Sequence, residues 1–289
     1  MPTPDLSRRT ALAAMAGTSS ALMLGATTAH SEEKPMKRKG NINHAVCKWC
    51  YKDLSLDELC QHAVKLGITG IDLLQVKELP TLKPYGLVCP MVGGPGSITK
   101  GWNDPSLHDT LVENSEKILP QIAEAGMTNM IVFSGNRGER SDAEGLKHCA
   151  KGLKRITPLA ESLGVNIVME LLNSKVNHPD YQCDKSPWGV ALCDEVGSDR
   201  FKLLYDIYHM QIMEGDVIQT ITDFHPYFAH YHTGGVPGRA EIDETQELNY
   251  PAICRAIVAT GYTGFVAQEF IPRKDPLTSL AHSIDTCDV

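Results

Sequence analysis

The chain has 289 residues, of which 21% are charged and 42% hydrophobic, and its formal net charge is −8. This is an ordinary composition for a globular protein, and the length suits one large α/β domain or two small ones. Nucleic-acid binding requires clustered lysine and arginine to displace counterions. No such cluster follows residue 40, so we expect no nucleic-acid partner.

The first 30 residues resemble a targeting segment rather than part of a fold. Arg8 and Arg9 precede a weakly apolar stretch, residues 11–29, which small residues close. Paired arginines before an apolar segment are typical of a twin-arginine export signal. A transmembrane anchor is the alternative, but the hydroxyl side chains in this stretch are costly in hydrocarbon. We therefore expect a signal over residues 1–30, a flexible polar leader over 31–40, and an exported, periplasmic protein without a stable membrane anchor.

Nine cysteines are scattered along the chain, and two of them, Cys47 and Cys50, have CxxC spacing. One CxxC without a second pair is weak evidence for zinc or redox chemistry. A chain of this length can also bury a core without the disulfide framework of small secreted proteins. We expect two packed thiols near the end of a strand.

Between residues 41 and 289, short apolar runs alternate with helical patterns. The runs predict eight strands, over residues 42–46, 70–74, 86–92, 129–133, 166–170, 201–205, 228–232 and 264–269. Helices are predicted over residues 54–66, 105–125, 142–163, 186–196, 216–223, 250–260 and 276–285. Strictly alternating β and α units of this total length are typical of a closed (β/α)₈ TIM barrel. An open doubly wound sheet is disfavoured, because no glycine-rich phosphate turn follows the first strand.

The last four predicted strands end in side chains that can bind a metal: Glu170, Asp206, His232 and Glu269. The active site of such a barrel forms at the carboxyl ends of its strands, and adjacent strands lie ~4.8 Å apart. One acid at such a place could be a loop residue or a helix cap, but four in succession predict a shared site. The carboxylates would repel each other unless a cation neutralised them. We expect one divalent cation, and three oxygen donors with one imidazole favour Mn²⁺, Co²⁺ or Mg²⁺ over structural zinc.

This ligand set suits the polarisation of a carbonyl and the stabilisation of an enediolate. Glu170 and Glu269 would flank a bound substrate. One could remove a proton from the carbon next to a carbonyl, and the other could return it to the neighbouring carbon. We therefore predict that both are catalytic. Trp49 and Trp188 are either walls of this pocket or part of the core.

Residues 205–214 closely resemble the signature of the hydroxypyruvate isomerase family, within the xylose isomerase-like barrel superfamily. Further motifs that carry the resemblance are residues 170–173, 235–239, 247–250 and 261–269. The resemblance implies a metal-dependent isomerase that interconverts hydroxypyruvate and 2-hydroxy-3-oxopropanoate, or a similar small hydroxy-keto acid. It also implies that His209 and Arg239 contact the substrate, where Arg239 could clamp a carboxylate. A packed histidine and a surface salt bridge are the respective alternatives.

One position departs from the hydroxypyruvate isomerases and another from the related ketose 3-epimerases. The third ligand is often glutamine in hydroxypyruvate isomerases and histidine in the related ketose 3-epimerases, and this chain has His232. The epimerases carry a further glutamate where this chain has Val176.

A ketose 3-epimerase, or another sugar isomerase or dehydratase of the superfamily, is therefore one alternative function. A non-catalytic exported sugar-binding barrel is another. A phosphodiester-cleaving repair enzyme is disfavoured, because it needs more metal ligands and a basic face. The expected partner is a small hydroxy-keto acid or sugar, and the sequence is compatible with a homo-oligomer.

Overall fold

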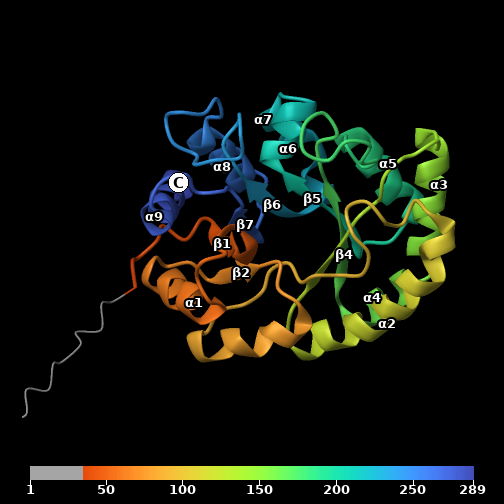
Figure 1. Cartoon of the computed structure of the whole chain (residues 1–289), viewed down its shortest axis with the longest axis horizontal. Helices are drawn as coiled ribbons and strands as arrows, with labels where there is room; N and C mark the ends of the chain where they lie inside the picture. The colour runs from red at the N-terminus through yellow and green to blue at the C-terminus, as the bar shows by residue number, and fades with distance from the viewer. Residues whose placement is uncertain (1–34) are drawn as a thin grey trace, which may run out of the picture. The chain divides into compact units, whose positions relative to one another are not determined.

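A single curled sheet of seven parallel strands forms the centre of the protein (Figure 1). The computed structural model describes residues 35–289. The strands are β1 (Asn43–Cys47), β2 (Gly70–Asp72), β3 (Asn129–Val132), β4 (Asn166–Leu171), β5 (Phe201–Asp206), β6 (Phe228–Thr233) and β7 (Phe265–Gln268). Their order in the sheet is β2-β1-β7-β6-β5-β4-β3. The signal predicted over residues 1–30 lies outside the described residues.

The predicted strand over residues 86–92 closes the barrel without forming a regular strand. Parallel bridges join Val88 to Gly70 of β2 and Val92 to Met130 of β3. This segment therefore fills the eighth position, between the two edge strands of the sheet. A proline within the segment has no N–H to donate, which limits regular pairing. The predicted (β/α)₈ barrel is confirmed.

Helices lie on the outside of the sheet (Figure 1). They are α1 (Leu56–Lys65), α2 (His108–Glu124), α3 (Asp142–Leu153), α4 (Thr157–Leu163), α5 (Ser186–Val196), α6 (Ile207–Met213), α7 (Val217–Phe224), α8 (Tyr250–Ala259) and α9 (Pro276–Cys287). Short 3₁₀ helices are η1 (Lys48–Cys50), η2 (Val76–Tyr85), η3 (Pro105–Leu107) and η4 (His225–Tyr227). None of the described helices is long and apolar enough to cross a lipid bilayer.

The helices correct the expectations from sequence at two places. The single helix predicted over residues 142–163 is two helices, α3 and α4, with a break before Pro158. A proline inside a continuous helix would clash with the preceding turn, and it is tolerated in the first turn of α4. Helix α6 was not among the predicted helices, because its residues directly follow a strand with no intervening loop.

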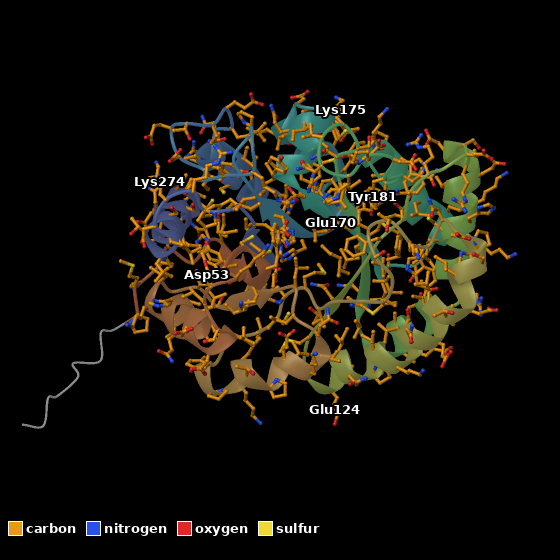
Figure 2. All side chains as sticks on the ribbon, viewed as in Figure 1. Asp53, Glu124, Glu170, Lys175, Tyr181 and Lys274 are labelled. Carbon is orange, nitrogen blue, oxygen red and sulfur yellow. The ribbon has the colours of Figure 1, made fainter. Side chains whose placement is uncertain are left out.

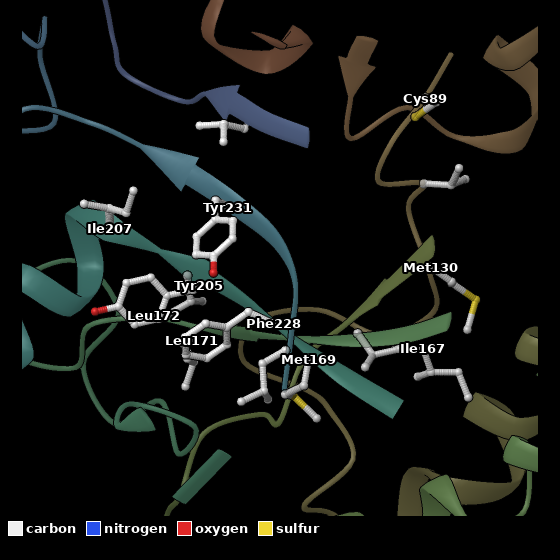
Figure 3. Close-up of a cluster of buried hydrophobic side chains, with 14 of the residues drawn as sticks. Cys89, Met130, Ile167, Met169, Leu171, Leu172, Tyr205, Ile207, Phe228 and Tyr231 are labelled. Atoms are coloured by element: carbon white, nitrogen blue, oxygen red, sulfur yellow. The ribbon is translucent and has the colours of Figure 1, made fainter. Parts of the chain in front are cut away.

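Side chains alternate along each strand between the helix layer and the barrel interior. The outward-facing side chains join one large buried cluster with the helices, and Figure 3 shows part of it, including Met169, Leu171, Tyr205 and Tyr231. A separate small cluster consists of Met91, Ile131, Val168 and Leu204, and no helix contributes to it. Because successive side chains of a strand point to opposite faces, Glu170 points inward like Val168.

Part of the predicted leader is bound to the barrel. The Arg38 side chain donates to the Leu66 carbonyl at 2.8 Å and forms an ion pair with Asp285 at 2.5 Å. The backbone N–H of Lys39 donates to Asp288 at 3.0 Å. The described end of the leader therefore connects the region after α1 to the C-terminal helix and is not a free linker.

The N-terminus of α1 gives a test of how local sequence stabilises this fold. Ser55 and Glu58 form a capping box, in which each side chain accepts a hydrogen bond from the backbone N–H of the other, at 3.2 and 2.8 Å. We expect Ser55→Ala to lower the free energy of unfolding by about 1 kcal/mol, measured by urea denaturation. Ser162→Ala is the control, because the Ser162 hydroxyl bonds only to Leu159 within α4. Equal stabilities of the two variants would contradict the capping role.

Candidate active site and metal centre

The structure brings the four predicted ligands together inside the barrel. Glu170 lies near the end of β4, Asp206 ends β5, His232 lies in β6, and Glu269 directly follows β7. The sheet register sets Asp206 opposite His232. One ligand atom of each residue lies within 4.8 Å of the corresponding atom of every other. All four are buried, and Glu170 and Glu269 are only 5% and 3% exposed. Figure 2 shows Glu170 deep within the ribbon, while Glu124 and Lys274 lie at its periphery.

Asp206 serves both the local fold and the site. Its Oδ1 atom accepts from the backbone N–H of His209 at 3.1 Å and so caps α6. Its Oδ2 atom lies 3.2 Å from Nη2 of Arg239. Burial raises the pKa of Asp206 to about 8, although Arg239 opposes the rise. The cap therefore fixes one carboxylate oxygen and leaves the other for the site.

Glu170 and Glu269 have opposite electrostatic surroundings. Burial raises the pKa of Glu170. Burial also acts on Glu269, but Arg239 and His232 beside it hold the pKa of its carboxyl group well below the usual range. Glu269 accepts from Trp49 Nε1 at 2.7 Å and from Arg239 Nη2 at 2.5 Å. Glu269 is therefore the more tightly held of the two carboxylates.

The two ring nitrogens of His232 face different groups. Nδ1 lies 2.8 Å from Glu269 Oε2 and 3.6 Å from Glu170 Oε1. Despite these distances, Nδ1 has no partner with hydrogen-bond geometry among the described residues. Nε2 faces away from Glu170 and Glu269 and lies 3.2 Å from Oδ2 of a different carboxylate, Asp72.

These residues fit a single divalent cation. Three carboxylates and one imidazole are a donor set suited to Mn²⁺, Mg²⁺ or Co²⁺. An octahedral ion with ligands at ~2.1 Å separates opposite ligands by ~4.2 Å, so atoms within 4.8 Å of each other can share one ion after small adjustments. Nδ1 of His232 is buried and has no hydrogen-bond partner among the described residues, so it is placed to offer a lone pair to an ion once it carries no proton.

Arg239 lies beside the ligands, in the site that the sequence predicted for it. Its guanidinium group lies between the rings of Trp49 and Tyr208, 5.2 and 5.3 Å from their centroids. Its Nη2 contacts both Asp206 and Glu269, and its Nη1 has no hydrogen-bond partner in the part of the chain that the structure describes. The guanidinium thus keeps a donor group available. Its contact with substrate stays a prediction.

His209 is held as a neutral hydrogen-bond donor. Its Nδ1 accepts from the backbone N–H of Asn173 at 3.1 Å and from the Asn173 side-chain amide at 2.6 Å. The amide orientation is fixed because its oxygen accepts from the backbone of Val176 and Asn177. Burial lowers the pKa of His209 well below its usual value. The proton therefore sits on Nε2, which is buried, 3.6 Å from Asp206 Oδ2, and unpartnered among the described residues.

The other residues singled out from the sequence divide into two groups. Trp49 belongs to the site, whereas Trp188 donates to the Asp142 carbonyl between α5 and α3. Val176 is 63% exposed. All nine cysteines are free thiols, including Cys47 and Cys50 of the CxxC pair. Sequence reasoning missed three contributors, Asp72, Asn173 and Tyr208.

Comparison with known proteins identifies the family. A family model described as a xylose isomerase-like TIM barrel matches residues 58–287, and the chain belongs to this family. The hydroxypyruvate isomerase of Escherichia coli is 34% identical over 106 residues, which cover 36% of this chain and 41% of that protein. The 2-oxo-tetronate isomerase of Pectobacterium atrosepticum is 26% identical over 243 residues, which cover 77% of this chain and 89% of that protein.

A crystal structure described as an AP endonuclease of family 2, from Brucella melitensis, has the same fold. It superposes with a TM-score of 0.77 at 22% identity, over 83% of this chain and 97% of that chain. For several of the curated relatives, the match spans less than half of the relative's own length.

Metal binding is the first property of this site to test. We expect the protein, after reloading with Mn²⁺ and dialysis, to hold about one ion per chain by elemental analysis, as one cluster of ligands requires. Asp206→Asn keeps a residue that can cap α6 but removes one charged ligand. We expect its Mn²⁺ affinity to fall at least ~10-fold, because even outer-shell changes cost that much. A wild-type protein without bound metal under these conditions would contradict the site.

Proposed function

We propose that this protein is a metal-dependent isomerase of a small hydroxy-keto acid, with hydroxypyruvate as the representative substrate. The observation that carries the proposal is the convergence of two buried carboxylates, Glu170 and Glu269, with a guanidinium group, Arg239, at one site. Two carboxylates can exchange protons with adjacent carbons of a substrate, and the guanidinium can bind its acid group. The names of the E. coli and Pectobacterium relatives support this substrate class.

The reaction requires no external oxidant or reductant. A carboxylate removes a proton from the hydroxymethyl carbon of hydroxypyruvate, and the C–H electron pair forms a double bond to the neighbouring carbon. The former carbonyl oxygen gains a proton, which gives an enediol. The second carboxylate then protonates the carbon that carried the carbonyl, while the other hydroxyl loses its proton and becomes an aldehyde. One carbon is oxidised and its neighbour is reduced within the same molecule.

The roles of the other residues follow from their positions. A bound divalent cation would polarise the carbonyl and offset negative charge in the enediolate. His209 presents an Nε2–H that can donate to a substrate oxygen, and its neutral state suits a donor rather than a proton carrier. Arg239 can bind the substrate carboxylate through Nη1 while Nη2 stays on Glu269. Burial of the site excludes water from the reacting carbons.

Glu269→Gln tests the catalytic role directly. We expect a loss of about 10²- to 10⁴-fold in kcat for hydroxypyruvate isomerisation at saturating Mn²⁺, because the amide cannot accept the proton. The matched control is Glu244→Gln, at an exposed glutamate, which should keep wild-type turnover. A non-catalytic sugar-binding barrel would show no turnover in the wild type and unchanged ligand affinity in Glu269→Gln.

The same assay in deuterium oxide separates the isomerase from a ketose 3-epimerase. An isomerase moves the carbonyl and leaves deuterium on the carbon that carried it. An epimerase exchanges a proton at one carbon while the carbonyl stays in place, and mass spectrometry with NMR distinguishes the two products. Exchange without carbonyl migration, over a panel of keto acids and ketoses, would overturn the isomerase proposal in favour of the epimerase.

Arg239 should decide between acidic and neutral substrates. A hydrogen bond to a charged group contributes ~1.5–3 kcal/mol, so we expect Arg239→Ala to raise the KM for keto acids by about 10- to 100-fold. The KM for neutral ketoses should change much less. Arg273→Ala is the control, because Arg273 is exposed and the hydrogen bond of its side chain is to the backbone carbonyl of Gly238, while its bond to Glu241 uses the backbone N–H that alanine retains. Equal losses for both substrate classes would refute a carboxylate clamp.

A further inference from the structure

A second cluster of buried polar side chains lies beneath the proposed metal ligands. It consists of Asp72 from β2 and of His230 and His232 from β6, and all three are fully buried. His230 and His232 are two residues apart, so their side chains lie on the same face of β6. Nε2 of His230 is 2.5 Å from Asp72 Oδ2, and Nε2 of His232 is 3.2 Å from the same oxygen.

Asp72 reaches this position across the barrel. Strands β2 and β6 are not neighbours, since β1 and β7 lie between them in the sheet. The inward side chains of the intervening strands are small: Ala45, Cys47 and Ala267 form a separate buried cluster. These small residues leave the space through which Asp72 contacts β6. Asp72 also pairs in register with Cys47, at the carboxyl ends of β1 and β2, and so lies close to the metal ligands.

The division of contacts around His232 determines which nitrogen can bind the ion. A metal-bound imidazole nitrogen must offer a lone pair, so the proton must be on the other nitrogen. Nδ1 faces the carboxylates and lacks a hydrogen-bond partner among residues 35–289, whereas Nε2 faces Asp72. The Cys47 thiol, 3.7 Å from Nε2, is a weaker acceptor than a carboxylate.

We propose that Asp72 is a positioning residue that sets the tautomer and orientation of His232 for metal binding, by accepting the Nε2 proton. His230 donates to the same oxygen and so holds the Asp72 carboxylate in place. This inference rests on the metal site of the proposed function. It extends that site to a strand on the far side of the barrel, and it gives a function to a buried acid that is not one of the four candidate ligands.

The affinity for Mn²⁺ alone, measured by isothermal titration calorimetry, tests this role. Asp72→Leu is close in size and removes the acceptor, and we expect it to weaken Mn²⁺ binding by about 10- to 100-fold. Asp72→Asn retains a neutral acceptor and should show a smaller loss. The matched control is Asp184→Leu, which removes a buried aspartate that accepts from Ser174. It should bind Mn²⁺ like the wild type.

A merely structural role for Asp72 would lower the melting temperature of the metal-free variants but leave the Mn²⁺ dissociation constant unchanged. That result, with one ion bound to the wild type, overturns the positioning role and leaves the proposed function intact. A wild-type protein that binds no Mn²⁺ removes the metal site itself, and with it this inference. The two failures are therefore distinguishable.

A measurement on the unmodified protein covers the case in which the Asp72 variants do not fold. In Mg²⁺-loaded protein labelled with ¹⁵N-histidine, the two-bond ¹H–¹⁵N spectrum reports which ring nitrogen carries the proton. The signals that respond to Mg²⁺ should show His232 protonated at Nε2 and unprotonated at Nδ1. A proton on Nδ1 in the loaded protein would overturn the proposal.

Discussion

The repulsion among three buried carboxylates is the constraint on which this site depends. Two like charges 4 Å apart repel by ~4 kcal/mol at an effective dielectric constant of ~20. Glu170, Asp206 and Glu269 lie together in one buried cluster, and Arg239 is a permanent positive charge that contacts two of them. One guanidinium offsets only part of the repulsion, which is consistent with the raised pKa of Asp206. A divalent cation would balance the remainder, so the charge count supports the proposed metal site independently of the ligand geometry.

Several side chains of the site also hold the local fold. Asp206 caps α6 with one oxygen and contacts Arg239 with the other. The side chain of Asn173 has two roles. Its Oδ1 atom accepts from the backbone of the loop after β4, and its Nδ2 atom donates to the ring of His209. Trp49, in the short 3₁₀ helix after β1, supports both Arg239 and Glu269. A single substitution here changes structure and chemistry together, so ligand affinity, stability and turnover must be measured separately.

The sequence predicted the barrel because its strands and helices alternate with clear periodicity, and it singled out the four candidate ligands because each ends or follows a predicted strand. Asp72 could not be found in that way. The apolar run predicted as a strand extended to Leu74, whereas β2 ends at Asp72 itself. A charged residue inside an apolar run was the available signal. His230 carried a similar signal, since it shares a strand face with His232.

Sequence periodicity could not predict side-chain contacts between strands that are not neighbours in the sheet. The pairing of Asp72 with β6 depends on small side chains on two intervening strands, and only the closed sheet brings them into one layer. The orientation of the His209 ring could not be predicted from the sequence for a related reason. Its protonated nitrogen is decided by a loop, residues 173–177, whose conformation no strand or helix pattern specifies. The sequence therefore predicted the order of strands and helices, whereas it did not predict the side-chain networks that join distant segments.

The Arg38 side chain links the region after α1 to helix α9, and we call this link the clasp. Its guanidinium spans from the carbonyl after α1 to Asp285 of α9, and the neighbouring backbone N–H of Lys39 adds a bond to Asp288. The first and last strands, β1 and β7, meet in a hydrogen-bonded seam, and the clasp joins the helical regions that follow these two strands. A truncation chosen at residue 41, where the apolar pattern starts, would remove the clasp and loosen the seam. Boundaries for recombinant expression should therefore retain the short basic stretch that precedes the first strand.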